Sequence, residues 1–520
     1  MIIDLNSASP SNRREADVAI VGGGLAGLVM AERLSRRGAR VVVLESGGAT
    51  QENDSHPLNQ VEMAAQSYSG AEHGRYRCLG GTSSRWGGAM LPFLKEDLED
   101  HTAGWGNAWG VAYSELMQHV PELEKIFELD PEPYDLEAGS RLFGETTSRF
   151  MLRSPKWPQF SARNVANVFH YELRRRDRLL VWLNATVVNF RFDGERCTGL
   201  RAQSLSGNWL DVSASNIVIT AGAIESTRLL LLINQATAGR ISGLALGRYF
   251  HDHLSAPIAN IVPRDGGSLN KTFAFRFVTK GMRNVRLELN GKTRRDNHLP
   301  GAFAHVSFAE RREGGFAAVR RLYQAVQRRI APSPADIKLL ALSAPWLLKA
   351  AYWRYVNHKV LAAEDAFWQL HLVTEQEPIA SNRVYLSQSR VDEFGLPLAV
   401  IDWRVSQSDV ARFEQVASFA KEEWGVRGFN LLGEYAPRDP ADVEVDLYAG
   451  GGIYHPAGST RIGNTHIDGV VNSRLQPFGA AGLHVVSTSV FPNCGGANPS
   501  MMLLLFALRA SDDLERELKL

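Results

Sequence analysis

Hydrophobic and polar positions near the start of the chain follow the order of a parallel α/β unit. Residues 18–21 (VAIV) form a short apolar run that predicts a buried strand, and a glycine cluster follows it directly. Residues 25–38 then place apolar side chains at helical spacing, and residues 41–45 (VVVLE) read as a second buried strand. Strand, helix and strand in such close succession predict a βαβ unit with parallel pairing.

Two later segments repeat this pattern, and a different pattern lies between them. Residues 216–220 (NIVIT) lead through a glycine turn into a helix over 221–233, and residues 483–486 (LHVV) precede an apolar helix over 499–514. Residues 382–387 and 398–405 are β-rich, which is typical of an antiparallel sheet. The predicted fold class is therefore α/β combined with α+β: a Rossmann-like, doubly wound domain assembled from separated pieces, and an inserted domain built on an antiparallel sheet.

Residues 310–359 differ from the rest in charge. They contain ten basic and three acidic residues, with apolar residues at helical spacing interrupted by the turn APSPAD. One interpretation is a surface hairpin that docks on a membrane or a partner protein. The interpretation we favour from sequence is an insertion whose basic face is solvated.

Composition narrows the functional classes. The 57 Lys and Arg residues nearly balance 56 Asp and Glu residues, so no overall field would recruit nucleic acid or an anionic membrane. Three cysteines cannot form a disulfide framework, and they lack a metal-ligand spacing. No signal-peptide order and no apolar run of about 18 residues are present, so we expect a cytoplasmic protein with a flexible lead-in over residues 1–14.

The first glycine cluster has the spacing of a dinucleotide site, because Gly22, Gly24 and Gly27 follow a strand and open a helix. Gly22 permits the tight turn, Gly24 lets backbone approach a pyrophosphate, and Gly27 allows close helix–strand packing. The helix start at Leu25 and Ala26 would hold the phosphates, and Glu45, with Ser46 beside it, would accept ribose hydroxyls. The alternative is a glycine-rich turn that binds nothing.

A second glycine cluster lies at residues 79–88 (LGGTSSRWGG). Such a loop lets backbone pass close to a large planar ligand, although by itself it could equally be an irregular loop. Its candidate cofactor-binding residues are Gly80, Gly81, Thr82, Ser83, Arg85, Trp86, Gly87, Gly88 and the adjoining Ala89.

With these motifs, the chain resembles the glucose–methanol–choline (GMC) family of FAD-dependent alcohol oxidoreductases. The resemblance also rests on ITAGAIESTRLLL, LGRYFHDH, HPAGSTRIG and the carboxy-terminal VVSTSVFPNCGGANPSMMLLLFALRASDDL, whose GGANP form is most similar to the pyranose-oxidase side of the family. It implies a discontinuous FAD-binding domain (15–95, 181–255 and 450–520) and a substrate-binding domain (96–180 and 256–449). Further cofactor contacts implied by the resemblance are Val187, Ala221, Gly222, Glu225, Ser487, Asn498, Pro499 and Ser500.

Two departures from the family pattern matter. Arg85 stands in the segment where a histidine of the pyranose oxidases carries a covalent flavin, so we expect non-covalent FAD. Ser487 stands where many members have an acid, which leaves that contact open.

The resemblance implies that His455 is the catalytic base and Asn498 its partner. Alcohol oxidation needs a base with a pKa near the working pH, and a neutral amide can orient the hydroxyl. Asn498 before Pro499 could instead be an ordinary helix N-cap. His251, Asp252 and His253 could be read as metal ligands, but they match the family's Asp-His element, and we predict no metal.

The implied activity is oxidation of a secondary alcohol, on a sugar or glycoside, to a ketone, with hydride transfer to flavin N5 and oxygen or a quinone-type or dye-type electron acceptor. A sterol-type or small-alcohol dehydrogenase is an alternative. A second alternative is the large subunit of an electron-transfer complex that docks through residues 310–359. A third is a non-redox lyase that contains FAD.

Overall fold

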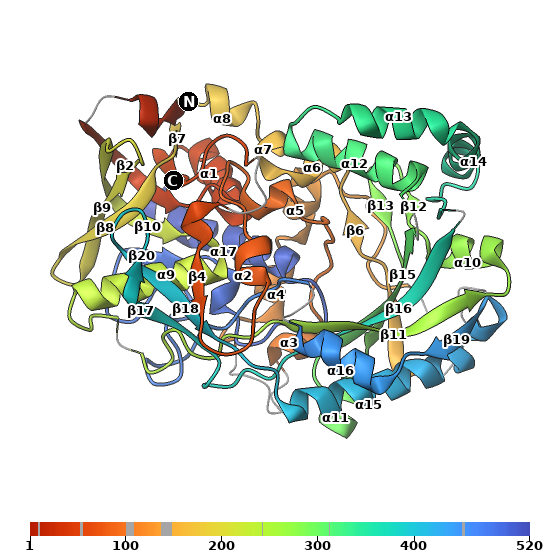
Figure 1. Cartoon of the computed structure of the whole chain (residues 1–520). Helices are drawn as coiled ribbons and strands as arrows, with labels where there is room; N and C mark the ends of the chain where they lie inside the picture. Colours follow the sequence, from red (N-terminus) through yellow and green to blue (C-terminus); the bar gives the residue numbers. More distant parts are fainter. Residues whose placement is uncertain are drawn as a thin grey trace.

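The computed structural model describes residues 1–8, 11–51, 56–99, 109–136, 148–241, 243–310, 313–363, 365–449 and 453–520. Two sheet-based halves lie side by side, one around β2 and β10 and the other around β11, β15 and β16 (Figure 1). Each half has its own hydrophobic core.

The larger sheet has a parallel centre and an antiparallel edge. β1, β7, β3, β2, β10 and β20 pair in parallel, whereas β9 and β8 complete the sheet as antiparallel strands. The strands are β1 (Ile2–Asp4), β2 (Ser11–Val21), β3 (Val41–Leu44), β7 (Leu179–Leu183), β8 (Thr186–Asp193), β9 (Arg196–Gln203), β10 (Trp209–Ile219) and β20 (Leu483–Val485). The parallel, doubly wound part is the predicted Rossmann-like arrangement.

We expected residues 1–14 to be a flexible lead-in, and this expectation is wrong for residues 1–8 and 11–14, which the structure describes. Ile2–Asp4 pairs with β7, and β2 already begins at Ser11. Ile2 and Ile3 are partly buried against the core, which gives this terminal strand an apolar anchor.

Two long helices cover the larger sheet. α1 (Leu25–Arg36) follows β2, and α17 (Ser500–Leu518) packs against α1. The buried Arg33 joins them through ion pairs with Glu515 at 2.9 Å and with Glu122 of α5 (Val120–Ile126) at 2.6 Å. The two ends of the chain therefore build one core.

The second sheet is antiparallel, in the order β19-β11-β16-β15-β14-β5. Its strands are β5 (Phe150–Arg153), β11 (His253–Pro263), β14 (Arg286–Leu289), β15 (Ala302–Glu310), β16 (Ala366–Glu375) and β19 (Gly433–Pro437). An antiparallel sheet was predicted, but not from these segments.

The segments that predicted that sheet form a separate small one. β17 (Arg383–Val391) pairs with β18 (Pro397–Asp402), and β18 pairs with β4 (Val61–Met63). β17 and β18 pack against α9 (Gly222–Ala236). β-rich composition identifies a strand but not its partner. Since β4 and β18 come from segments expected in different domains, the expected boundaries do not separate the sheets.

The basic insertion forms three helices rather than a simple hairpin: α12 (Gly315–Arg328), α13 (Pro334–Leu342) and α14 (Ala344–Tyr355) (Figure 1). Ser333 accepts a hydrogen bond from the amide of Ala335 and so begins α13 within the APSPAD turn. Arg311 and Arg312 lie outside the described residues. Among the described helices, none has both the length and the apolar character to cross a membrane.

Candidate active site

A cavity of about 580 Å³ lies at the carboxyl ends of β2, β3 and β10, where parallel α/β sheets bind ligands. Most of the predicted site residues line it. They are Gly22, Gly24, Leu25, Ala26, Glu45, Ser46, Gly81, Thr82, Ser83, Arg85, Trp86, Gly87, Gly88, Ala89, Ala221, Gly222, Glu225, His455, Ser487, Asn498, Pro499 and Ser500.

Three predicted cofactor residues, Gly27, Gly80 and Val187, do not line this cavity. A Cβ at Gly27 would lie 2.1 Å from the carbonyl oxygen of Gly22, so this glycine provides the predicted close helix–strand packing. A Cβ at Gly80 would lie 2.1 Å from Oδ1 of Asn164, so a side chain does not fit at this position of the second glycine loop. Val187, on β8, packs in the hydrophobic core.

The start of α1 suits the pyrophosphate of a dinucleotide. Its N-cap is Gly24, with no side chain capping the first amides and no acidic residue in the first turn. These amides and the positive end of the helix dipole favour an anion in the cavity. The two glycine loops touch here, since a Cβ at Gly81 would lie 2.9 Å from Cα of Gly24.

Glu45 occupies the end of β3, where its carboxylate also orders the loops. Oε2 accepts from the amide of Gly23 and Oε1 from the amide of Gly47, each at 2.8 Å. A carboxylate oxygen can accept more than one hydrogen bond, so Glu45 can still receive a ribose hydroxyl. The cavity volume and these donors and acceptors fit FAD.

The loop at residues 79–88 is held by a residue that the sequence did not indicate. Gln327, near the end of α12, donates from Nε2 to the carbonyls of Ser83 at 3.1 Å and of Trp86 at 3.0 Å. It is buried, although it belongs to the basic insertion. The insertion thus contacts the wall of the cavity directly, and no local motif marks that contact.

His455 and Asn498 meet at the cavity. Nδ2 of Asn498 lies 3.1 Å from Nε2 of His455, although 43 positions separate them in sequence. The N-cap of α17 is Pro499, and no side chain caps that helix, so the interpretation of Asn498 as a helix cap is wrong. Gly451 and Gly452, which precede His455 in the chain, lie outside the described residues.

Arg286 is a second site residue without a sequence signal. It lies on β14, and its Nη2 donates to Oδ1 of Asn498 at 2.5 Å. Its guanidinium carbon lies 4.1 Å from the ring centroid of Phe303. Burial lowers the pKa of Arg286 to about 10, so the group remains charged at neutral pH.

These contacts determine where the protons of the site lie. Arg286 can only donate, so the atom of Asn498 that it contacts is the carbonyl oxygen, and Nδ2 donates to Nε2 of His455. Neutral His455 then carries its proton on Nδ1, which lies 3.0 Å from Nδ1 of His253. His253 accepts there and donates from Nε2 to the carbonyl of Gly495 at 2.8 Å. The arrangement directs the lone pair on Nε2 of His455 toward Asn498.

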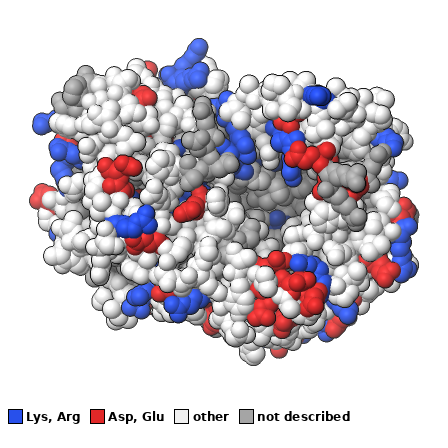
Figure 2. Space-filling model, viewed as in Figure 1, with Lys and Arg blue, Asp and Glu red and all other residues white. Residues whose placement is uncertain are grey.

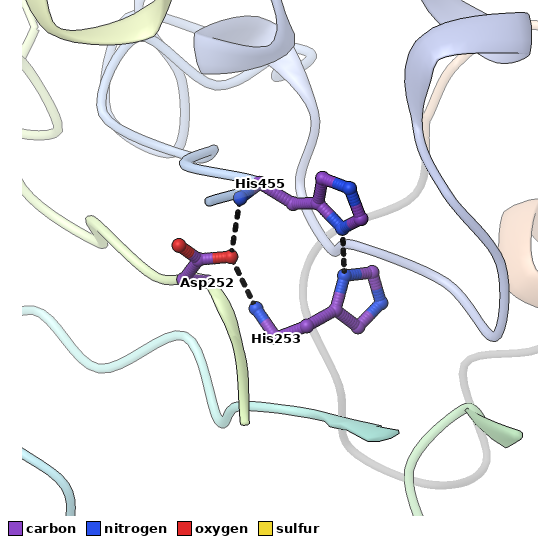
Figure 3. Close-up of side chains that lie close together, drawn as sticks. All are labelled: Asp252, His253 and His455. Atoms are coloured by element: carbon purple, nitrogen blue, oxygen red, sulfur yellow. Dashed lines mark hydrogen bonds between the residues drawn. The ribbon is translucent and has the colours of Figure 1, made fainter. Parts of the chain in front are cut away.

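Asp252 fixes the backbone beneath the two imidazoles (Figure 3). Its Oδ1 accepts from the amides of His253 at 2.6 Å and His455 at 2.7 Å, and Oδ2 accepts from the hydroxyl of Tyr68. Asp252, His253 and His455 are close enough to hold a metal ion, but hydrogen bonds engage both carboxylate oxygens and the facing Nδ1 atoms. His251 turns away, with Nδ1 2.8 Å from the carbonyl of Tyr249.

Burial dominates the electrostatics of this cluster. Burial, His253 and Arg286 all lower the pKa of His455, well below its usual value, so the imidazole is neutral at neutral pH. Burial also lowers the pKa of His253 to about 4 and raises the pKa of Asp252 to about 7. The pKa of the Cys494 thiol is raised well above its usual value by burial, so this thiol lacks the activation of a nucleophilic cysteine.

Comparisons with known proteins agree with these features. Residues 17–339 match the family model for FAD-dependent oxidoreductases, and residues 378–507 match that for GMC oxidoreductases. The fructose dehydrogenase large subunit of Gluconobacter japonicus is 20% identical, with 97% of this chain and 98% of that protein covered. The oxygen-dependent choline dehydrogenase of Rhizobium johnstonii is 22% identical, with 96% and 95% covered. The structure of pyridoxine 4-oxidase from Mesorbium loti is similar in fold, with a TM-score of 0.57 and 16% identity over 96% of this chain and 99% of that one.

Proposed function

The chain belongs to the GMC family of FAD-dependent oxidoreductases, and from this premise we propose that it oxidises a secondary alcohol of a sugar or glycoside to a ketone. One observation carries the proposal: a neutral imidazole, His455, directs its Nε2 lone pair to an amide at the lining of the cofactor cavity. Bound FAD supplies the acceptor for the carbinol hydrogen, which leaves as hydride to N5.

The side chains supply the proton chemistry. When the substrate hydroxyl binds, it replaces Asn498 as the donor to Nε2 of His455, which then takes the hydroxyl proton, and Nδ2 of Asn498 donates to the substrate oxygen and orients it. Arg286 and His253 are positioning residues, because they act through Asn498 and His455 respectively. Arg286 keeps the amide from turning its oxygen toward the base.

The cofactor contacts follow from the cavity lining. The amides at the start of α1 would hold the pyrophosphate, and Glu45 would hold the ribose. Glu225 lines the cavity as an anion: burial raises its pKa, but Arg77, Arg228 and Arg75 outweigh that effect and lower the pKa to about 2. With Arg85 in place of the histidine, we propose that FAD is bound without a covalent link. Acid precipitation of the yellow protein should then leave the flavin in the supernatant; flavin in the pellet would contradict this.

The sugar assignment is supported by the similarity to a fructose dehydrogenase large subunit, and a small alcohol is supported by the similarity to choline dehydrogenases. The test is anaerobic mixing of the holoenzyme with sugars, glycosides, choline and simple secondary alcohols while the flavin absorbance is followed. Reduction by a sugar or glycoside is expected. Reduction by choline or a simple alcohol alone would favour the small-alcohol alternative, and no reduction by any of them would refute the redox proposal.

The base is tested with His455→Ala. This variant should bind FAD but be reduced slower by at least about 100-fold, the lower end of general-base contributions. Near-normal reduction would remove His455 from the mechanism. Reoxidation of the reduced holoenzyme by oxygen and by a quinone, compared in the same instrument, identifies the preferred acceptor.

A further inference from the structure

α13 and α14, the outer helices of the basic insertion, bury fewer side chains than surface helices normally do. α12 packs inward through Ala317, Ala318 and Ala325. By contrast, α14 has no buried residue, and the only buried residue of α13 is Asp336. A surface helix of a folded protein usually buries one apolar face, so these two helices present an unusual surface.

Large apolar side chains are concentrated on these helices. Among the described residues, 21 large apolar side chains are exposed, and nine of them lie between residues 323 and 356. Five of these side chains lie within α13 and α14, and a sixth follows α14 directly. Their exposed fractions are 58% for Ile337, 72% for Leu342, 75% for Leu348, 59% for Tyr352, 77% for Tyr355 and 59% for Val356. Single exposed apolar residues are ordinary, but a cluster of this kind marks an interaction site.

The periodicity of α14 places several of these apolar side chains on one side of the helix. Leu348, Tyr352 and Tyr355 follow one another at helical spacing and therefore share a stripe. Beside α14, an apolar groove of about 660 Å³ is lined by Leu348, Tyr352 and Trp353 of α14 and by Trp368 of β16. Tyrosine has an apolar ring and a polar hydroxyl, which suits a boundary between apolar material and water.

The exposed charges on the outer helices have one sign. Lys338, Lys349 and Arg354 are exposed, whereas the only acid of α13 and α14, Asp336, is buried and accepts from Arg321 at 2.6 Å. The surface over these helices is mainly uncharged, with scattered basic side chains (Figure 2). Because the whole chain carries a net charge of only +1, this positive character is local.

We propose that this surface docks the protein on an anionic phospholipid membrane. We define the α13–α14 face as Ile337, Lys338, Leu342, Leu348, Lys349, Tyr352, Tyr355 and Val356. Basic residues beside exposed Leu and Tyr residues are the composition of helices that lie in a membrane interface. A second copy is a poor occupant, because a twofold contact would bring the same cations against one another.

The test uses the FAD-loaded protein and sedimentation with vesicles. Binding to vesicles of equimolar phosphatidylcholine and phosphatidylglycerol should exceed binding to phosphatidylcholine alone, and salt should weaken it. Lys338→Gln with Lys349→Gln should weaken binding by about 25-fold, at about fivefold for each cation. Leu348→Ser should weaken binding by about tenfold through lost apolar burial.

The matched control is Leu205→Ser, which changes an equally apolar side chain, 61% exposed, between β9 and β10. It should bind vesicles as the unchanged protein does, and all variants should retain the flavin spectrum. Equal binding to both vesicle types, or unchanged binding of the Leu348 and lysine variants, would overturn the proposal. So would a dimer of the unchanged protein that Leu348→Ser converts to a monomer, because the face would then be covered by a second copy.

Discussion

Replacing Arg286 by methionine removes one hydrogen bond and one positive charge from beneath the proposed catalytic pair. The lost bond joins Nη2 of the buried Arg286 to Oδ1 of the partly buried Asn498 at 2.5 Å. A hydrogen bond to a charged group contributes about 1.5–3 kcal/mol, and Asn498 loses its orientation without it. If that free energy is fully expressed in the transition state, kcat/KM falls by about 10- to 150-fold.

The lost charge affects the pH dependence in a direction that the structure determines. Arg286 is the third contributor, after burial and His253, that lowers the pKa of His455. Its removal therefore raises that pKa. Because the base must be neutral to accept a proton, the acid limb of the kcat/KM profile should move to higher pH.

Two variants separate this role from general stability. Arg286→Lys retains the charge, so its acid limb should stay close to that of the unchanged enzyme even if the rate falls. Arg283→Met removes an equally buried arginine that bonds Asp130 and the carbonyls of Pro133 and Ser154 instead, so it should leave the limb in place. The assay is anaerobic flavin reduction over pH. Normal kcat/KM and an unmoved limb in Arg286→Met would refute the reasoning.

Three further predictions test other parts of the structure. Gly24→Leu should give colourless protein, because its side chain would enter the cavity at the pyrophosphate position; a normal flavin spectrum would contradict that placement. Glu225 has a folded-state pKa of about 2, so its ionised form should stabilise the fold by about 3 kcal/mol above its unfolded pKa of about 4.3, and this contribution should disappear as pH falls toward 2. Denaturant unfolding across that range should show this loss, whereas Glu225→Gln should lack it; parallel pH curves would contradict the ion-pair account. Gln327→Leu leaves the carbonyls of Ser83 and Trp86 without their buried donor and should weaken FAD binding by at least about tenfold, measured by flavin fluorescence; unchanged affinity would show that α12 does not order the loop.

The elements that sequence predicted well are those with a local cause. The apolar run before Gly22, the glycine spacing and the helical periodicity after it lie within a short window, and β2, α1 and β3 follow that pattern. The antiparallel pairing of β17 with β18 agrees with the prediction, but their place in a separate sheet with β4 was not predicted, because strand propensity contains no information on which edge a strand will meet.

The residues of the candidate site also divide into those that a local motif indicates and those that no local motif indicates. His455 and Asn498 could be named in advance, because each lies in a recognisable motif. Arg286 and Gln327 could not, since each acts through one long-range hydrogen bond or a pair of them, 212 positions from Asn498 in one case and 244 from Ser83 in the other.

By itself the sequence determined the βαβ unit, the glycine turns that line the cavity and the two residues proposed for proton transfer. Tertiary structure alone decided which nitrogen of His455 is available, through Arg286 on one side and His253 on the other, and which face of α14 remains exposed. The physical reason is that glycine turns and helical periodicity are set by neighbours in sequence. Proton positions and exposure are set by neighbours in space, which the chain acquires only when both sheets have formed.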